Sequence, residues 1–343
     1  PLSATQTTAP STAPPTVTPP RTVTACVGDV LLDGVAPPAE EGGWQDVSNL
    51  LASADITLAN LEAPITTHTA PTPHKSSGAI ARGEEFLFRT APHRALSVLQ
   101  GMGADAVCLA NNHTLDYRPA GLTDTLGALS EANIGSAGAG TRTEARQAAQ
   151  VGQIRLLSYV EDDTLPGADD FSASDRPGVA VVDLTPSGPG PETARMVRAD
   201  IARAARSGGI VVVGVHWGQE GSSKPTPGQR AFAHFCIEAG ADMVWGHHPH
   251  VLQPVEIYRG SLIAYSLGNF IFPTPRHEPL LSSAVLITCH QGKTLAAASL
   301  VGVILDGDAS AYGLPELALD MRRRDRMRRR LLPPSTIVAD RKM

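Results

Sequence analysis

Short apolar runs alternate along most of the chain with segments in which apolar residues recur every three or four positions. The apolar runs predict strands at residues 22–28, 56–60, 105–110, 209–215, 241–245, 261–266 and 283–289. The periodic segments predict helices at residues 92–102, 119–132, 192–206 and 228–239. Strands that alternate with helices in this way are typical of an α/β fold.

The two ends of the chain depart from this pattern. Residues 1–22 consist almost entirely of Pro, Thr, Ser and Ala, a composition that predicts a disordered linker. Residues 306–343 contain the run MRRRDRMRRR and are expected to form a basic helix or tail, either solvated or in contact with anionic lipid or polymer. The folded domain is therefore expected to span residues 23–305.

The N-terminal stalk also bears on location. A Ser/Thr/Pro-rich segment before a folded domain often follows a signal peptide or membrane anchor, and this chain begins at Pro1. We expect an extracytoplasmic protein, tethered or secreted through an N-terminal segment absent from this chain; a trimmed cytoplasmic linker is the alternative. The net charge of −6 argues against nucleic acid as a partner.

The four cysteines, Cys26, Cys108, Cys236 and Cys289, lie in apolar segments and lack the paired spacing of a metal site. Buried free thiols are expected, and a disulfide between Cys26 and Cys108 is the alternative in an exported protein. Residues 161–178 are expected to form a long acidic loop. A calcium site there is disfavoured, because the regular carboxylate spacing of an EF-hand is missing.

Side chains with oxygen or nitrogen donors follow five of the expected strands. In chain order they are Asp29, Asn60, Glu62, Asn111, Asn112, His113, Asp116, His216, His247, His248 and His250. Ligands of open α/β sheets bind beyond the carboxyl ends of the strands, so these side chains are expected to form one site. Carboxylate, amide and imidazole donors without thiolate suit one or two divalent ions of Mn, Fe or Zn.

Some of these residues have structural alternatives. Asp29 would also serve as a helix N-cap, and His216 as a buried core histidine. Asn111 is expected to be a turn residue, because Asn tolerates left-handed backbone. His247 is expected to be structural.

Six motifs follow one another between about Val23 and Phe272: GDVLLD, ANLEAPIT, LANNHTLDY, VHWGQE, GHHPHVLQPVEIYRG and YSLGNFIF. Together they resemble the ordered motif set of the CapA family of capsule and poly-γ-glutamate synthesis proteins, a branch of the calcineurin-like metallophosphoesterases. The resemblance implies a four-layer sandwich of two mixed β-sheets flanked by helices. It also implies a dinuclear metal centre at the strand ends.

The resemblance implies a role for each motif residue. The metal ligands would be Asp29, Glu62, Asn112, His216, His248 and His250. His113 would hydrogen-bond to or protonate the leaving group, and Asp116 would orient His113. Asn60 and Asn269 would lie beside the metal, where substrate binds.

Two positions differ from the usual pattern of the superfamily. Leu31 stands where a histidine ligand usually follows the first aspartate, and Asp33 is a candidate substitute for that ligand. Glu62 stands where the bridging aspartate is usual. Both changes are usual in CapA-like sequences.

Two functions follow from these observations. The first is a metal-dependent hydrolase of phosphoester type, acting on a phosphoester or an anionic polymer, with His113 as the acid. The second is a non-catalytic accessory subunit of a membrane synthase and export complex for poly-γ-glutamate, whose metal pocket holds polymer or a partner. The His113–Asp116 pair favours the enzyme, whereas Leu31 and the stalk favour the accessory role.

Overall fold

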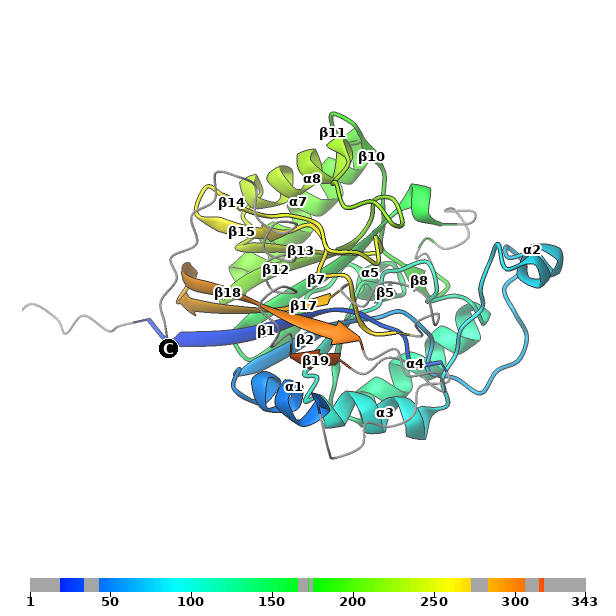
Figure 1. Ribbon diagram of the computed structural model, residues 1–343. Helices are drawn as coiled ribbons and strands as arrows, with labels where there is room; N and C mark the ends of the chain where they lie inside the picture. Colours follow the sequence, from blue (N-terminus) through cyan, green and yellow to red (C-terminus); the bar gives the residue numbers. More distant parts are fainter. Residues whose placement is uncertain are drawn as a thin grey trace, which may run out of the picture.

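The computed structural model of the chain describes residues 19–33, 43–165, 172, 175–272, 283–305 and 315–317. Two large mixed β-sheets lie face to face in it, and helices cover their outer faces (Figure 1). Each of the seven expected strands and four expected helices is present, with ends shifted by a few residues. The expected α/β fold, a four-layer sandwich of two mixed sheets flanked by helices, is therefore confirmed.

The first sheet is built around four parallel strands. Its order is β19 (Pro315–Leu317), β18 (Thr294–Leu305), β17 (Ser283–Gln291), β1 (Arg21–Val30), β2 (Ile56–Leu61), β3 (Ala106–Cys108) and β4 (Gly135–Ala137). Strands β1 to β4 are parallel, and β17 to β19 continue the sheet in antiparallel fashion. A short strand, β16 (Asn269–Ile271), pairs with the end of β1 in parallel.

The second sheet also has a parallel centre with antiparallel edges. Its order is β14 (Val255–Tyr258), β15 (Ser261–Ala264), β13 (Met243–His247), β12 (Ile210–His216), β7 (Ile154–Glu161) and β6 (Ala149–Val151), with β9 (Val181–Val182) beside β7. Strands β15, β13, β12 and β7 are parallel. Two short antiparallel pairs complete the strands: β5 (Ala139–Gly140) with β8 (Gly178–Val179), and the hairpin of β10 (Leu184–Thr185) with β11 (Gly188–Pro189).

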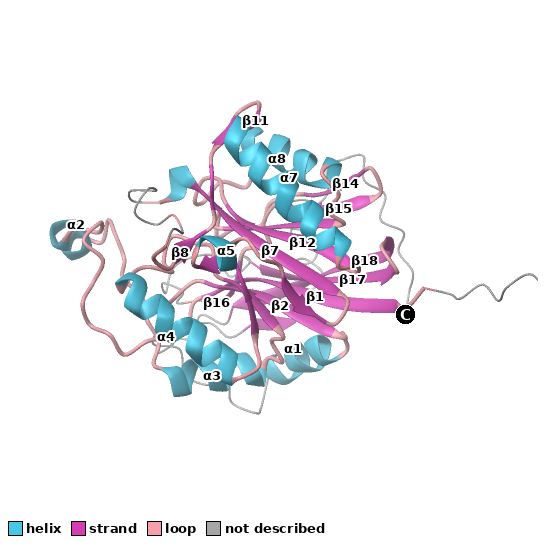
Figure 2. Cartoon of the chain, turned by 180° about the vertical axis from the view of Figure 1, so that it is seen from behind, coloured by secondary structure: helices cyan, strands magenta, loops and turns pink. Residues whose placement is uncertain are grey.

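Helices form the two outer layers (Figure 2). Those over the first sheet are α1 (Gly43–Ala52), α3 (Pro92–Gly101) and α4 (Arg118–Glu131), and those over the second are α7 (Pro191–Arg206) and α8 (Pro227–Glu238). Short helices occur at α2 (Ser77–Arg82), α5 (Arg142–Ala145) and η1 (Asp162–Thr164). Helix α2 stands on a loop that projects from the body (Figure 1). None of the described helices is long and apolar enough to cross a membrane.

Three apolar cores hold the four layers together. In β1, successive side chains point to opposite faces, so Val27 packs under the helices while Cys26 packs between the sheets. Leu58, Val212 and Trp245 belong to the same inter-sheet core as Cys26. Because both faces of these strands are buried, the strands read as continuous apolar runs in the sequence.

The structure tests the expectations about the cysteines and about the ends of the folded domain. All four cysteines are free, so the alternative disulfide between Cys26 and Cys108 is absent; Cys289 is only half buried. Strand β1 begins at Arg21, inside the expected linker, and β19 lies inside the expected C-terminal tail. The rest of the linker and the basic run MRRRDRMRRR lie outside the described residues, as does part of the acidic loop.

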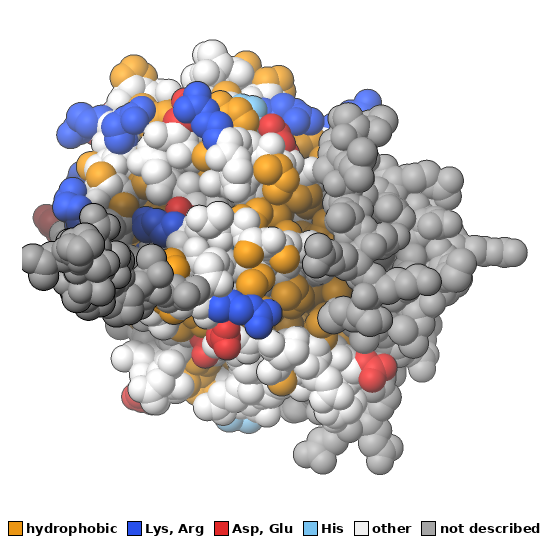
Figure 3. Space-filling model, turned by 90° about the vertical axis from the view of Figure 1, so that its left-hand side faces the viewer, with side chains coloured by type: hydrophobic (Ala, Val, Ile, Leu, Met, Phe, Trp, Pro, Cys, Tyr) orange, Lys and Arg blue, Asp and Glu red, His pale blue; other side chains and the backbone are white. Residues whose placement is uncertain are grey.

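Figure 3 views the end of the sandwich where β1 begins. Hydrophobic side chains gather in the middle of this face, next to residues that the structure does not describe. Lys and Arg side chains are scattered around them and alternate with a few acidic ones.

One buried ion-pair cluster joins α7 to the second sheet. Asp200 accepts hydrogen bonds from Arg146 at 2.8 Å and 3.0 Å, from Arg203 at 2.7 Å and from Tyr159 at 3.2 Å.

Asp200→Ala leaves these donors without their acceptor, so we expect the free energy of unfolding to fall by about 2 kcal/mol. Urea denaturation measures the change. Glu192→Ala, which removes an exposed carboxylate 3.7 Å from Arg195 on the same helix, is the control and should leave the midpoint unchanged; an equally unchanged Asp200→Ala midpoint would contradict the prediction.

Candidate metal centre

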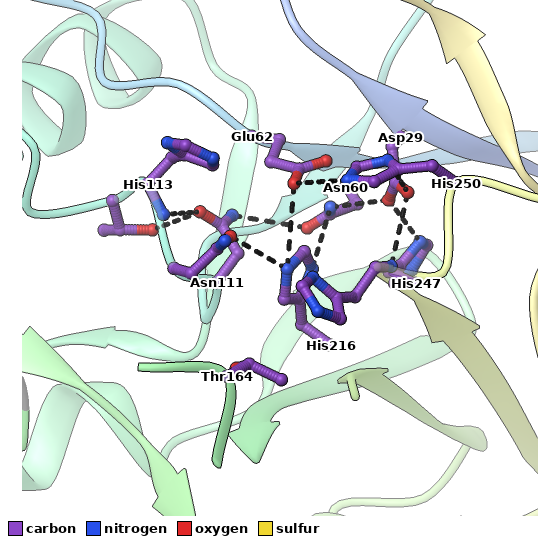
Figure 4. Close-up of polar contacts among 12 residues, drawn as sticks. Asp29, Asn60, Glu62, Asn111, His113, Thr164, His216, His247 and His250 are labelled. Atoms are coloured by element: carbon purple, nitrogen blue, oxygen red, sulfur yellow. Dashed lines mark hydrogen bonds and ion pairs between the residues drawn. The ribbon is translucent and has the colours of Figure 1, made fainter. Parts of the chain in front are cut away.

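The candidate metal ligands converge at the carboxyl ends of parallel strands from both sheets (Figure 4). Asp29 comes from β1, Glu62 directly follows β2, and His216 ends β12. His248 and His250 follow β13, whose last residue is His247. Parallel strands place their carboxyl ends at one edge, so residues distant in the sequence meet there.

Glu62 lies at the centre of this cluster. Its Oε1 atom is 3.7 Å from Nε2 of His216 and 3.7 Å from Nε2 of His250. Two groups of ligand atoms, each within 4.8 Å of one another, share Glu62: one with Asp29 and His216, the other with His248 and His250. A carboxylate common to two ligand groups would be able to help hold two cations.

The unpartnered atoms of the cluster fit a bound cation. Glu62 is fully buried, yet neither of its carboxylate oxygens accepts a hydrogen bond from a residue that the structure describes. Nδ1 of His248 likewise has no hydrogen-bond partner among the described residues. A buried carboxylate without donors is strongly unfavourable, and a cation between these atoms would remove that penalty.

Asn112 joins the cluster from the loop that follows β3. Its Oδ1 atom lies 3.0 Å from Nε2 of His216, and its side chain is partly buried. The amide oxygen and the imidazole nitrogen therefore face the same region. All six predicted ligands lie in one cluster.

Two asparagines hold the ligands in place. Asn60 donates through Nδ2 to Oδ1 of Asp29 at 2.8 Å, and Oδ1 of Asn269 lies 2.8 Å from Nδ1 of His250. Because Nδ1 of His250 faces an acceptor, its Nε2 remains free to face Glu62. Contact of Asn60 and Asn269 with a substrate stays a prediction.

Burial and neighbouring charges set the protonation of the histidines. Burial lowers the pKa of His248 to about 3, which leaves its ring neutral and able to ligate. Burial also opposes charge on His250, but the carboxylates of Glu62 and Asp29 outweigh it and raise the pKa of His250 to about 10. Burial opposes charge on Asp29 as well, but the imidazoles of His247 and His250 outweigh it and hold the pKa of Asp29 well below the usual value, since their Nδ1 atoms lie 3.2 Å and 3.4 Å from its carboxylate oxygens. Since ligands bind metal without their protons, cation binding here would release a proton from His250.

The backbone at the histidine pair is strained. His248 has φ 92° and His250 has φ 55°, values that residues other than Gly and Asn adopt infrequently. Strained backbone of this kind costs about 1–3 kcal/mol per residue and clusters at functional sites. These backbone angles occur where the chain brings the rings of His248 and His250 to Glu62.

His113 and Asp116 lie beside the metal cluster in the same loop as Asn112. Nδ1 of His113 is 2.9 Å from Oδ2 of Asp116, and the Asp116 side chain is completely buried. Phe88 packs against the His113 ring with 4.8 Å between ring centroids, and its backbone N–H donates to Oδ2 of Asp116 at 2.8 Å. Burial, and then the charge of Lys75, lower the pKa of His113.

Asn111 and His247 contact other parts of the protein, but Asn111 is not among the residues with left-handed backbone, which was the reason for expecting it in a turn. Asn111 is fully buried, donates to the Leu61 carbonyl at 2.8 Å and accepts from the His113 backbone N–H at 3.1 Å. It therefore fixes the turn that presents Asn112 and His113. His247 is buried with Nδ1 3.2 Å from Oδ1 of Asp29.

Asp33 does not replace the ligand that is missing at position 31. Leu31 is fully buried and offers no donor atom. Asp33 accepts from the Arg89 backbone N–H at 3.4 Å and belongs to neither of the ligand groups found among the described residues. The cluster therefore has six predicted ligands without a replacement for the missing histidine.

Lys75 is a site residue that the sequence did not reveal. It comes from the projecting loop before α2 and contacts both His113 and Asp116. No motif or spacing marks it, because only the folded loop brings it to the strand ends. The one available signal was its rarity, since the chain has a single lysine between Pro1 and Arg206.

Comparison with known proteins places this site in a family. The family described as "Bacterial capsule synthesis protein PGA_cap" matches residues 23–274, which include every candidate ligand. A "PGA biosynthesis protein CapA" of Bacillus subtilis is 32% identical over 252 residues, which are 72% of this chain and 62% of that protein. A "Probable polyglutamine synthesis accessory protein" of Mycobacterium tuberculosis is 36% identical over 226 residues, covering 64% of this chain and 56% of that protein.

A third relative is the "Capsule biosynthesis protein CapA" of Bacillus anthracis, 30% identical over 236 residues, covering 67% of this chain and 53% of that protein. This chain thus spans between about half and three fifths of the length of these relatives. The family match covers most of the folded domain and the complete ligand cluster. The chain belongs to the CapA family of bacterial capsule synthesis proteins.

Proposed function

We propose that this chain is a metal-dependent hydrolase of phosphoester type that serves capsule or poly-γ-glutamate biosynthesis. The observation that carries the proposal is the buried carboxylate of Glu62, which has no hydrogen-bond donor among the described residues and faces ligand nitrogens on two sides. A purely structural buried carboxylate would accept hydrogen bonds. The neighbouring His113–Asp116 pair supplies the acid that hydrolysis needs.

The residues of the proposed site have two roles: some would hold cations, and one would donate a proton. Asp29, Glu62, Asn112, His216, His248 and His250 would hold one or two divalent ions of Mn, Fe or Zn. Ions bound there act as Lewis acids toward a phosphoryl or carbonyl oxygen. Asn60 and Asn269 fix the orientation of two ligands, and His113 donates a proton to the leaving group.

The substrate, partner and location follow as parts of the same proposal. The substrate is a phosphoester or an anionic polymer, and the partner is a membrane synthase or export complex. Relatives described as accessory to polyglutamine synthesis support an assembly of this kind. An extracytoplasmic location belongs to the same proposal, because the proposed partner is a membrane synthase or export complex.

An accessory role without catalysis is the second candidate. Leu31 favours it, because the position usually held by a ligand carries an apolar side chain. In that role the cluster would hold anionic polymer or a partner rather than hydrolyse a bond.

His113→Ala tests the catalytic role. We expect hydrolysis by the metal-reconstituted variant to fall by about 10²- to 10⁴-fold, because the leaving group loses its proton donor. The measurement is turnover of phosphomonoesters, phosphodiesters and γ-glutamyl oligomers. His234→Ala, which removes a partly exposed histidine paired with Glu256, is the control and should retain activity.

The same screen separates the two candidates. If the parent chain and His113→Ala are equally inert toward every substrate, catalysis is wrong. Binding of γ-glutamyl oligomers that depends on His248 and His250 would then support the accessory role.

A further inference from the structure

Phe86 is one of two large hydrophobic residues that are exposed in the part of the chain that the structure describes, and it is 54% exposed. The other is Ile257, which is 53% exposed on the edge strand β14. A single exposed apolar residue is ordinary on a protein surface. Phe86 differs from Ile257 because its ring belongs to a row of rings that ends at the candidate site.

The row of rings consists of Phe86, Phe88 and His113. The rings of Phe86 and Phe88 are stacked, with 5.8 Å between their centroids and 5° between their planes. Phe88 also contacts His113, with 4.8 Å between the centroids. Phe86 is exposed, Phe88 is half-buried and His113 is buried, so the row leads from solvent to the proposed acid.

Polar contacts fix the backbone at both phenylalanines. The carbonyl oxygen of Phe86 accepts from the Lys75 ammonium at 3.0 Å, and the backbone N–H of Phe88 donates to Oδ2 of Asp116 at 2.8 Å. The Lys75 and Asp116 side chains are buried, and both contact His113. The residues that surround His113 therefore also hold the exposed Phe86 ring in place.

The position of this row suits the leaving group of a substrate. In the proposed hydrolysis, His113 donates its proton to the leaving group, so the leaving group lies next to His113. The part of the leaving group beyond the cleaved bond then passes Phe88 and Phe86 on its way to solvent. Aromatic rings attract a further ring in offset-stacked or edge-to-face geometry, beyond the effect of the area that they bury.

We propose that Phe86 and Phe88 form a leaving-group subsite, and that the substrate is a phosphoester whose alcohol carries an aromatic ring. This inference rests on the proposed function and deepens it, because it selects one class among the proposed substrates. Phe86 is then a specificity-determining residue that contacts the leaving group and takes no part in proton transfer or metal binding. Its contact lies away from the reacting bond, so it lowers KM for esters with a ring and leaves kcat nearly unchanged.

Matched phosphomonoesters test the subsite on the full, metal-reconstituted chain. The leaving groups of 3-phenylpropyl phosphate and propyl phosphate react alike, but only the first carries a ring. We expect kcat/KM of the parent to be about 10-fold higher for the phenylpropyl ester, mainly through KM. Phe86→Ala should abolish this preference and Phe86→Trp should keep it, while Ile257→Ala, which removes the other exposed apolar side chain, should leave it unchanged.

Three results would overturn the subsite. The first is a parent chain without a preference, which can be measured whether or not Phe86→Ala folds. The second is an equal loss of kcat/KM for both esters in Phe86→Ala, because a merely structural role of the loop predicts that result. The third is an equally large preference for 3-cyclohexylpropyl phosphate, which would indicate apolar contact without ring stacking.

Binding distinguishes failure of the subsite from failure of the proposed hydrolase. The probes are 3-phenylpropylphosphonate and propylphosphonate, which lack the P–O bond that hydrolysis would cleave, and calorimetry on the zinc-loaded chain measures their affinity. Tighter binding of the phenyl compound that Phe86→Ala abolishes, in a chain that hydrolyses neither ester, would refute the hydrolase and leave the subsite standing. Equal binding of the two phosphonates, or binding of neither, would overturn the subsite.

Discussion

A His248→Ala/His250→Ala double variant is expected to bind no metal, whereas the parent chain is expected to bind one or two divalent ions per molecule. The two histidines supply imidazole nitrogens to one of the two ligand groups that share Glu62. Removal of a hydrogen-bond partner outside the ligand sphere typically weakens metal binding about 10- to 100-fold, so loss of two ligands should exceed that range. Elemental mass spectrometry of protein purified without chelators measures the stoichiometry.

The control for this variant removes two histidines elsewhere. His68→Ala/His234→Ala takes away two side chains that are 49% and 33% exposed and belong to neither ligand group, so its metal content should match the parent. A chelator should lower the melting temperature of the parent and the control but not that of the His248/His250 variant, because only a bound ion stabilises the folded state. Undiminished metal in the variant would refute the proposed ligand set.

The number of metal ions bound by the parent chain also distinguishes the hydrolase from the accessory role. Two ions would show that Asp29, Glu62 and His216 form a complete site without a histidine at position 31. One ion would confine binding to one of the two ligand groups and would strengthen the accessory role that Leu31 favours.

The sequence predicted the central strands and the convergence of the candidate ligands, because both depend on the same repeated pattern of buried parallel strands. Strands buried on both faces read as apolar runs, and the parallel ones end at a common edge. Asp29, Glu62 and His216 could therefore be assigned to one site from their positions directly after such runs. The motif resemblance added the assignment of ligand roles.

Strand β7 and Lys75 were not predicted from the sequence, because neither lies in a regular apolar pattern. Strand β7 carries Arg155 and Ser158 within its apolar run, and its central place in the second sheet depends on pairing with β12. Lys75 lies in a loop without periodicity, and its approach to Asp116 depends on how both legs of the loop pack. Contacts of this kind are set by tertiary packing, which local sequence patterns do not encode.

Gly28→Ala is expected to destabilise the domain strongly and to disturb the metal centre at the same time. A Cβ atom at Gly28 would lie 1.9 Å from the carbonyl oxygen of Gly268, a backbone atom that no side-chain rotation can move away. The next residue, Asp29, donates its backbone N–H to that same oxygen at 2.9 Å and pairs with Asn269. The close approach of β1 to the segment before β16 therefore requires glycine at this position.

The expected loss for Gly28→Ala is more than about 3 kcal/mol in the free energy of unfolding, since overpacking against backbone forces the two segments apart. Urea denaturation measures it, and metal content should fall because Asp29 and Asn269 shift together. Gly127→Ala is the matched control: its Cβ would meet nothing within 4 Å on the exposed side of α4, where alanine favours the helix by about 0.5–1 kcal/mol. If both variants unfold at the parent midpoint, the approach of β1 to Gly268 does not require glycine at position 28, and the prediction is wrong.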